Sequence, residues 1–474
     1  MSRSASDHRS SLADGRSVYL DGEVIDVGRH PLFAGIVDTI GDLVETGGQP
    51  DLRRCLPGSE HDAAMWWHTP RTRDDLTARR RASERLAERT CGFVGRGPDH
   101  VASFFAGFAG DPSVFGERAG VACDLWREAA QRDLYVSYVI IPPSIDRSRR
   151  AEGGPITQVR VVEQDAEGMI VDGDLILGTG TAVSDWLFVS CIPPLAEGMD
   201  DHALSFVVPV ATDGLRLHCR NPYGAQTSVF DAPLSTRFDE TDGLVVFDNV
   251  RVPWEQVLVV GDRAATAAQF HNTSAHTLGN LQAQIRLAVK LRFMLGLAHR
   301  IIDVSGARDT AGALADLAEL GALTAGVEAH VLAAEYRAQP DAAAVMVPDK
   351  RYLYAAMSRQ AEIYPRALHL LRSLTSSQLI DLPSSVAAID HPDLVRHGSS
   401  PETSAEERVK LYRLAWDVVG SEFAARHHQY EMFYAGAPTV SAAHLRRTWR
   451  FEEATALLDQ AMGGWDRSTP LPGS

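Results

Sequence analysis

The spacing of apolar and polar residues divides the chain into a helical part, a strand-rich part and a second helical part. Near the start, Asp21-Gly22 lies between two short apolar runs in residues 17–27, which predicts a hairpin. Apolar residues at helical spacing predict helices over residues 31–45, 72–90 and 124–132. The arginine cluster at 79–81 is expected on a solvated or subunit-facing side. These patterns predict an N-terminal helical domain over residues 1–133 with one short hairpin.

The pattern changes at 134–141, a β-branched and aromatic run that is typical of a strand. Pro142-Pro143 ends this strand, because proline lacks an N–H donor and favours an extended backbone. The following loop either contacts a ligand or forms an ordinary polar strand exit. Its polar side chains include Ser144, Arg147 and Ser148.

Short β-rich runs separated by turn signals predict a middle β domain over residues 134–265. The predicted strands after the first are 157–162, 169–171, 186–191, 204–210, 243–247 and 256–260. Residues 178–183 superficially suggest a dinucleotide loop, but the third glycine is missing and a predicted strand follows instead of a helix. We therefore reject a Rossmann site and keep the hydroxyls of Thr179 and Thr181 as candidates for contact with a bound ring system.

From His276 onward the pattern is helical nearly to the end, which predicts a helical domain over residues 266–474. An apolar stripe from Leu281 to Ile302 indicates core or a helix-bundle interface. Residues 375–404 are rich in loop signals, and 463–474 are expected to form a loose tail. Further helices are predicted over 311–338, 350–373 and 405–426.

Composition and charge narrow the class of protein. The 474 residues are 45% apolar, enough for a large core, and the formal charge of −16 argues against nucleic acid or an anionic membrane as a partner. Five cysteines without a C-x-x-C pair indicate neither a disulfide framework nor a zinc site, so no metal is predicted. With no export signal and no run of about 20 apolar residues, we expect a cytoplasmic protein.

A glycine-punctuated segment, 91–100, holds the main candidate chemistry and is not expected to form regular helix. Arg96 is permanently cationic, whereas His100 can gain or lose a proton near neutral pH. Together they could bind a phenolate or carboxylate and manage its proton. The ordinary alternative is an ion pair between Arg96 and Asp99 beside an exposed histidine.

Segments in one consistent order over residues 15–440 resemble the oxygenase component of 4-hydroxyphenylacetate 3-monooxygenase. They include Gly95-Arg96-x-Pro98-Asp99, Asp133-Leu134, Asp146-Arg147-Ser148, Arg237-Phe-Asp-Glu240, Val246-Phe247-Asp248, Val252-Pro-Trp254, Lys290-Leu-x-Phe, Gly420-Ser-Glu-Phe423, Gln429-Tyr430-Glu431 and Phe433-Tyr-Ala-Gly436. The resemblance implies an α+β, acyl-CoA dehydrogenase-like fold with an N-terminal helical domain, a middle β-barrel and a C-terminal helical bundle.

The same resemblance implies a two-component flavin monooxygenase. A separate NAD(P)H:flavin reductase would supply reduced FAD, which would react with O2 to give a C4a-hydroperoxyflavin and hydroxylate a phenol ortho to its hydroxyl. An electrophilic peroxide needs an electron-rich ring, which positive or donor groups at the phenol oxygen favour. A homotetramer assembled through the C-terminal helices is also implied. A phenylacetate, a tyrosine derivative, a chlorophenol and a carrier-tethered aromatic all remain open as substrates.

Candidate catalytic residues follow from matching positions. Arg96 matches the family's arginine beside the phenol oxygen, whereas His100 stands at the family's tyrosine and Tyr138 at its histidine. This exchange either preserves a proton relay from opposite sides, with His100 as proton acceptor and Tyr138 as donor, or signals a different substrate. His276 matches a functional histidine of some halophenol-hydroxylating relatives, or merely precedes a helix. The implied FAD contacts are Ser144, Arg147, Ser148, Thr179, Thr181, Tyr434 and Gly436.

Two other flavoproteins and a nonenzymatic helical scaffold are the alternatives. A 4-hydroxybutyryl-CoA dehydratase would need cysteines in the loop of Arg96 and His100, and another at position 283, which is alanine here. An acyl-CoA dehydrogenase would need a catalytic carboxylate, for which Glu422 and Glu431 are candidates by residue type alone.

Overall fold

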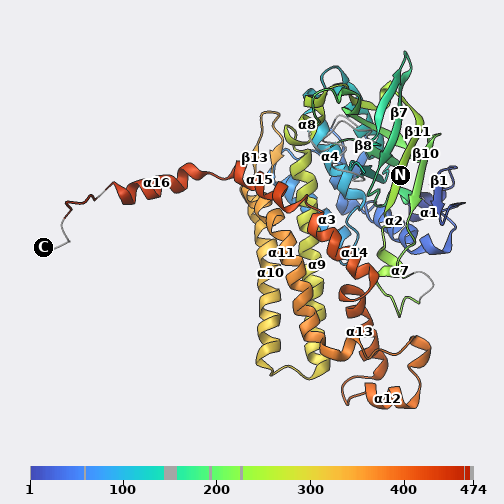
Figure 1. Ribbon diagram of the computed structural model, residues 1–474, viewed down its shortest axis with the longest axis vertical. Helices are drawn as coiled ribbons and strands as arrows, with labels where there is room; N and C mark the ends of the chain where they lie inside the picture. Colours follow the sequence, from blue (N-terminus) through green and yellow to red (C-terminus); the bar gives the residue numbers. More distant parts are fainter. Residues whose placement is uncertain are drawn as a thin grey trace.

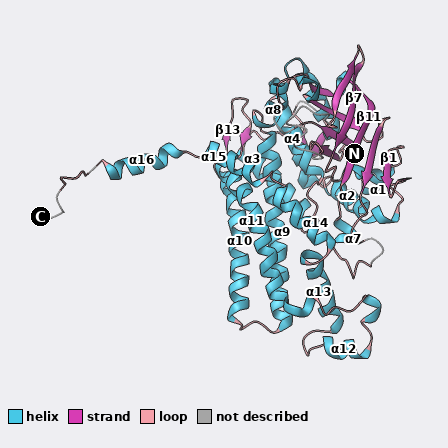
Figure 2. Ribbon diagram, viewed as in Figure 1, coloured by secondary structure: helices cyan, strands magenta, loops and turns pink. Residues whose placement is uncertain are grey.

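A bundle of long helices stands beside two β-sheets in the computed structural model (Figure 1; Figure 2). The structure describes residues 2–57, 60–143, 157–191, 195–224, 228–463 and 465–469. Helices before and after the sheets give the predicted acyl-CoA dehydrogenase-like order. The N-terminal helices are α1 (Ala5–Ser11), α2 (Ala34–Thr46), α3 (Arg73–Arg89), α4 (Pro98–Gly110) and α5 (Ala119–Gln131).

Helices α2, α3 and α5 overlap the predicted helical ranges, whereas α1 and α4 lie outside them. Helix α3 begins at a capping box formed by Thr72 and Asp75, which satisfies backbone N–H groups at its first turn. The expectation of a solvated or subunit-facing side is wrong for Arg79, which is only 6% exposed and donates to the carbonyl oxygens of Trp66 and His68. Helix α4 begins at Pro98, so the end of the glycine-punctuated segment is helical.

Two sheets form the middle of the molecule. Their strands are β1 (Ser17–Leu20), β2 (Glu23–Ile25), β5 (Val136–Val139), β6 (Arg160–Gln164), β7 (Gly168–Leu175), β8 (Trp186–Val189), β9 (Leu204–Pro209), β10 (Leu215–Cys219), β11 (Gly243–Pro253) and β12 (Val257–Val260). The six-stranded sheet has the order β2-β1-β10-β11-β7-β6, and the four-stranded sheet has the order β12-β9-β8-β5. Strand β10 is absent from the sequence-based prediction.

The N-terminal hairpin belongs to the six-stranded sheet. Strand β1 pairs with β2 antiparallel and with β10 parallel, with Val18 opposite Leu217. The two sheets approach each other at one corner, where a bridge joins Ile141, just after β5, to Ile176, just after β7. Closure of the sheets into a barrel stays a prediction.

The C-terminal part is built on three long helices that lie side by side, α9 (Ala275–Ser305), α10 (Ala311–Tyr336) and α11 (Lys350–Thr375) (Figure 1). The predicted apolar stripe of α9 is buried at all its positions except Leu295, which is partly buried. Of the described helices, α10 alone is long and apolar enough to meet the length and composition criteria for a membrane span, which core helices also meet.

Shorter segments complete the C-terminal part. The predicted helix over 405–426 is instead two helices, because Ser421 caps a new helix directly after Gly420. Helix α16 extends away from the body of the molecule and has no buried residue (Figure 1). The remaining elements are β3 (Arg53–Cys55), β4 (Asp62–Ala64), α7 (Ser235–Phe238), α8 (Arg263–His271), β13 (Gln339–Pro340), β14 (Met346–Val347), α12 (Pro392–Gly398), α13 (Ala405–Val419), α14 (Glu422–Phe433), α15 (Pro438–Thr448) and α16 (Phe451–Met462).

Candidate active site

Arg96 lies directly before α4, where the chain meets the end of α14. Its backbone N–H donates to Glu240 Oε1 at 2.5 Å, and its carbonyl oxygen accepts from the Tyr135 hydroxyl at 2.6 Å. The preceding Gly95 permits this approach, because a Cβ there would lie 2.2 Å from the Tyr430 hydroxyl oxygen. The backbone around Arg96 is therefore fixed by contacts with both the middle and C-terminal parts of the chain.

Three tyrosine rings surround the guanidinium of Arg96. Its central carbon lies 4.3 Å from the ring centroid of Tyr138, 4.6 Å from that of Tyr434 and 5.8 Å from that of Tyr430. Burial alone would lower the pKa of Arg96, but the tyrosine hydroxyls and the Glu240 carboxylate outweigh burial and raise it. Arg96 thus keeps a permanent positive charge inside an aromatic enclosure.

His100 extends this enclosure from the first turn of α4. Its ring stacks on Tyr138 with centroids 5.2 Å apart and an interplanar angle of 11°. Burial, followed by the charges of Arg96 and Arg286, holds the pKa of His100 well below its usual value, so its ring is neutral at pH 7. Arg96 Nη1 donates to Nε2 at 2.7 Å, which leaves the ring hydrogen on Nδ1.

Two buried polar atoms in this enclosure have no hydrogen-bond partner among the described residues. They are His100 Nδ1 and the Tyr430 hydroxyl. By contrast, the Tyr434 hydroxyl donates to the Gly95 carbonyl oxygen at 2.7 Å. Buried polar atoms are normally paired, so this arrangement has donors available for a ligand oxygen beside a fixed positive charge. It suits a phenolic or other oxyanionic group that sits against aromatic faces.

The two candidate threonines are held next to this enclosure by hydrogen bonds within the protein. Thr179 Oγ1 donates to Asp242 Oδ1 at 2.6 Å, and Thr181 Oγ1 donates to the Gly178 carbonyl oxygen at 2.8 Å. Asp242 also pairs with Arg426 at 2.7 Å, which helps hold its pKa low despite burial. A hydroxyl that donates can still accept, so each threonine retains acceptor capacity toward a ligand.

Behind the tyrosines lies a buried ion network that sequence reasoning did not assign to the site. Glu431 accepts from Arg286 at two oxygens, each at 2.7 Å, from Lys290 at 2.6 Å and from Gln360 at 2.8 Å. Lys290 Nζ is also 3.2 Å from His427 Nδ1. Two of the sequence segments quoted above, Lys290-Leu-x-Phe and Gln429-Tyr430-Glu431, contain two of these residues, Lys290 and Glu431, and that was the available signal.

The pKa values of Lys290 and Glu431, which form an ion pair, are both lowered, but for different reasons. Burial opposes ionisation of Glu431, but Arg286 and Lys290 outweigh it and lower its pKa to about 2. Burial lowers the pKa of Lys290 to about 7, and the charge of Arg286 adds to this effect. We take the carboxylate as ionised, since Arg286 remains its partner even where Lys290 is neutral. The network joins α9, α11 and α14 directly behind Tyr430 and Tyr434.

The remaining predicted residues lie elsewhere. His276 is in the first turn of α9, with Nδ1 3.1 Å from the Tyr354 hydroxyl, and its ring contacts are with Tyr354, His271 and His444 instead of the Arg96 enclosure. Gly436 forms the turn after α14 with φ +96°, a conformation that favours glycine. The predicted contacts Ser144, Arg147 and Ser148 lie outside the described residues.

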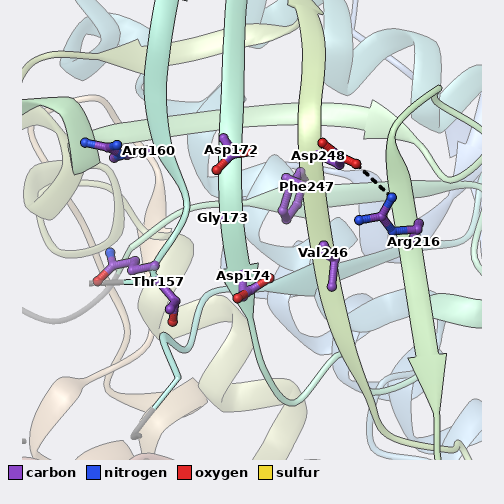
Figure 3. Close-up of a pocket in the computed structure, with 10 residues that line it drawn as sticks. Thr157, Arg160, Asp172, Gly173, Asp174, Arg216, Val246, Phe247 and Asp248 are labelled. Atoms are coloured by element: carbon purple, nitrogen blue, oxygen red, sulfur yellow. Dashed lines mark hydrogen bonds and ion pairs between the residues drawn. The ribbon is translucent and has the colours of Figure 1, made fainter. Parts of the chain in front are cut away.

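A separate groove lies on the six-stranded sheet (Figure 3). Its lining includes Arg160, Asp172 and Asp174, and an ion pair between Arg216 and Asp248 at 2.8 Å borders it. None of the predicted site residues that the structure describes lines this groove. We therefore place the candidate active site at Arg96.

The fold and the enclosure around Arg96 together define a class of protein with helices before and after the sheets and a buried, cationic, aromatic site. Within this class, the family model described as 4-hydroxyphenylacetate 3-hydroxylase N terminal matches residues 4–259, and its C-terminal counterpart matches residues 266–463. The chain therefore belongs to the 4-hydroxyphenylacetate 3-hydroxylase family.

Similar proteins span nearly the whole chain. A pyoverdin chromophore biosynthetic protein of Pseudomonas aeruginosa is 33% identical, over 97% of this chain and 95% of that protein. The oxygenase component of 4-hydroxyphenylacetate 3-monooxygenase from Thermus thermophilus is 32% identical, over 89% and 88%. A crystal structure of such an oxygenase component with FAD and 4-hydroxyphenylacetate has a TM-score of 0.92 at 29% identity, covering 98% of this chain and 100% of that chain.

A 4-hydroxybutyryl-CoA dehydratase from N. maritimus shares the fold, with a TM-score of 0.88 at 16% identity over 99% of this chain and 97% of that chain. That similarity concerns the fold alone. Residues 96, 100 and 283 are arginine, histidine and alanine here, none of which supplies a thiolate for an iron–sulfur cluster.

Proposed function

We propose that this chain is the oxygenase component of a two-component, FADH2-dependent phenol monooxygenase. The observation that carries the proposal is the Arg96 guanidinium within a tyrosine enclosure, beside two buried polar atoms that have no partner among the described residues. In the overall reaction, reduced FAD and O2 convert a phenol to a catechol. One oxygen atom enters the ring ortho to the hydroxyl, and the other leaves as water.

The enclosure also fits a flavin. A polar ring system could stack on its tyrosine faces. It could also form hydrogen bonds with the Tyr430 hydroxyl, which has no partner among the described residues, and with the hydroxyls of Thr179 and Thr181, which can still accept. Tyr434 and Gly436, at the end of α14, are further candidates, as are the sequence-based candidates Ser144, Arg147 and Ser148. When bound, reduced FAD would supply the electrons that activate O2 into an electrophilic oxygen donor.

Arg96 would activate the substrate by stabilising phenolate. Its fixed charge lowers the pKa of a phenol held beside it, and phenolate makes the ortho carbon electron-rich. Apart from His100 Nε2, no described group accepts a hydrogen bond from the guanidinium, so donors remain for the substrate oxygen. The surrounding rings would exclude water from this oxygen and strengthen the interaction.

His100 and Tyr138 would hold the same oxygen. In the arrangement described above, His100 Nε2 accepts from Arg96. If the substrate oxygen takes over that Arg96 N–H, Nε2 becomes available as the proton acceptor, and the Tyr138 hydroxyl can donate a hydrogen bond to the same oxygen. The stacking of the two rings keeps them on one side of the guanidinium.

The test uses the purified chain, mixed anaerobically with reduced FAD and then with ¹⁸O2 and a panel of phenols. We expect an ortho-hydroxylated product that carries one ¹⁸O atom, and tighter binding of reduced than of oxidised FAD. With NADH and oxidised FAD, but without a reductase, we expect no NADH oxidation, because no Rossmann loop is present. Lack of any labelled product across the panel, or direct NADH oxidation by the chain alone, would contradict the proposal.

A further inference from the structure

Three histidines from separate elements meet at one end of the helical bundle. His271 is the last residue of α8, His276 is in the first turn of α9, and His444 is in α15. Their ring nitrogens that can bind a metal all lie within 4.8 Å of one another. The ring centroids are 4.8 Å apart for His271 and His276, 5.2 Å for His271 and His444, and 5.1 Å for His276 and His444.

The orientation of His276 is set by a neighbouring tyrosine. The Tyr354 hydroxyl lies 3.1 Å from His276 Nδ1, which leaves Nε2 available toward the other two rings. Metal-binding histidines usually engage their second nitrogen in this way, which fixes the tautomer and the plane of the ring. No hydrogen bond joins a ring nitrogen of His271 or His444 to another residue in the described part of the chain.

Each ring can offer one nitrogen to a shared ion, because the three ligand atoms lie within 4.8 Å of one another. A neutral imidazole binds a metal through the lone pair of its unprotonated nitrogen. The cluster therefore supplies up to three nitrogen ligands from three different helices.

We propose that His271, His276 and His444 bind one first-row divalent ion of the Zn²⁺ type and leave a coordination position open. Three imidazole nitrogens are a ligand set that suits zinc, copper or nickel, whereas magnesium and calcium prefer oxygen ligands. His271 is exposed, so water can reach the fourth position. The sequence pattern predicts no metal site, because the ligand His444 is remote in sequence from the other two and lies in a different helix.

A metal ion here would join the C-terminal segment to the body of the molecule. His444 belongs to α15, which leads into the unburied helix α16, whereas the other two histidines belong to α8 and α9. Binding would therefore hold α15 in place and protect the segment around it from proteolysis. This role does not depend on the proposed hydroxylation.

Two cationic residues near the cluster allow a second test, because removing a cation should strengthen metal binding and removing a ligand should weaken it. Lys350 lies close enough to influence all three histidines, and Arg447 influences His271 and His444. These cations repel a divalent ion, so removing one should strengthen metal binding. A group of histidines that merely packs together would show no such response.

The experiment measures Zn²⁺ binding to the tag-free full chain after chelator treatment, by competition with a chromophoric chelator. We expect one equivalent per chain, and Co²⁺ should give a visible absorption band. His271→Ala and His444→Ala should each weaken Zn²⁺ binding by about tenfold or more. Lys350→Gln should tighten it. His299→Ala removes an exposed histidine of α9 outside the cluster and should leave binding unchanged.

Circular dichroism of each variant checks that the fold is kept, and limited proteolysis with and without Zn²⁺ gives a second readout. In the wild type, Zn²⁺ should slow cleavage around α15, and it should not do so in His444→Ala. The assignment is overturned if the wild type takes up no stoichiometric Zn²⁺, or if the His271→Ala and His444→Ala variants bind it as the His299→Ala control does. Unchanged or weaker binding in Lys350→Gln would also overturn it.

Discussion

Arg96 combines a fixed charge with a restricted position. Its backbone is tied to Glu240 and Tyr135, and its guanidinium is enclosed by tyrosine rings. A residue so placed can act on a ligand without first reorganising, which is how preorganised sites stabilise developing charge. The consequence is that substitution at Arg96 should affect catalysis more than folding.

We predict that Arg96→Gln lowers kcat/KM for a phenolic substrate by about 10- to 150-fold. This corresponds to the loss of about 1.5–3 kcal/mol for a hydrogen bond that involves a charged group. Steady-state kinetics with a saturating supply of reduced FAD measures the effect. Arg359→Gln, which changes an exposed arginine of α11, is the matched control. Equal kcat/KM values for the two variants would remove Arg96 from the proposed site.

His100 and Tyr138 are stacked against each other beside the same guanidinium, so their substitutions should not act independently. We predict that the double variant His100→Tyr, Tyr138→His retains more hydroxylation than either single variant, because it restores the arrangement implied by the family. Product formation in single-turnover reactions measures this. Losses that simply add, with the double variant the least active, would mean that the two side chains do not share one substrate oxygen.

At the scale of elements, the Glu431 network connects three helices of the C-terminal part. Its members are almost fully buried, with side-chain exposures of 1% or less for Arg286, Lys290 and Glu431. Loss of one member leaves an unpaired buried charge, and this cost exceeds the net contribution of the intact pair. The network therefore acts mainly to fix how α9, α11 and α14 meet behind the tyrosines.

We predict that Glu431→Gln lowers the free energy of unfolding by about 3–5 kcal/mol, because Arg286 loses its buried partner. Urea denaturation followed by circular dichroism measures this. The matched control is Glu319→Gln, whose partner Arg366 and own side chain are 43% and 41% exposed. For this exposed pair we expect little or no loss of stability, because solvent screens the interaction. A similar small loss in both variants would contradict the prediction.

The same network gives a pH dependence. The pKa of Glu431 falls from its ordinary value to about 2 on folding, so the carboxylate stabilises the fold above its unfolded pKa. That contribution decreases as pH falls through the range from about 4.3 toward 2. The difference in unfolding free energy between the wild type and Glu431→Gln should therefore shrink below pH 4.3. A constant difference down to pH 2 would mean that Glu431 has an ordinary pKa.

Local pattern was enough to predict the longest helices and most strands of the two larger sheets, because helical and strand periodicity report which face of a segment is buried. Local pattern did not predict features that depend on contacts between distant parts of the chain. Strand β10 has only five residues, of which two, Leu215 and Leu217, are buried, and Arg79 is buried because backbone carbonyl groups surround it. The position of Arg96 followed from matching segments, but its tyrosine enclosure and the three-histidine cluster combine residues from distant parts of the chain.

At the scale of the whole molecule, apolar surface remains uncovered on the C-terminal helices. Leu314, Leu332 and Tyr336 of α10 are exposed, as are Leu457 and Leu458 of α16. Such surface is typical of a region that another subunit covers. It supports the predicted homotetramer, although α9, where the sequence suggested an interface, is mostly buried within the chain.

We predict that light scattering on the eluted protein gives about four times the mass of the 51.6 kDa chain. Replacing Leu314 and Leu332 of α10 by lysine should shift the protein toward smaller species, because charge is costly in a buried interface. The control replaces Val24 and Leu244, which are exposed on the six-stranded sheet. A 51.6 kDa monomer under all conditions would reject the tetramer.

The pairing of β1 with β10 constrains how the chain folds during synthesis. Ser17 pairs with Arg216, so the first hairpin must wait for about 200 further residues before its edge is covered. At a synthesis rate of about 5–20 residues per second, that wait lasts roughly 10–40 s. Until then β1 presents an unpaired edge, on which a nascent chain is vulnerable to wrong pairing. Slower translation before residue 215 should therefore lower the yield of native protein, and a chaperone that shields the N-terminal hairpin should restore it.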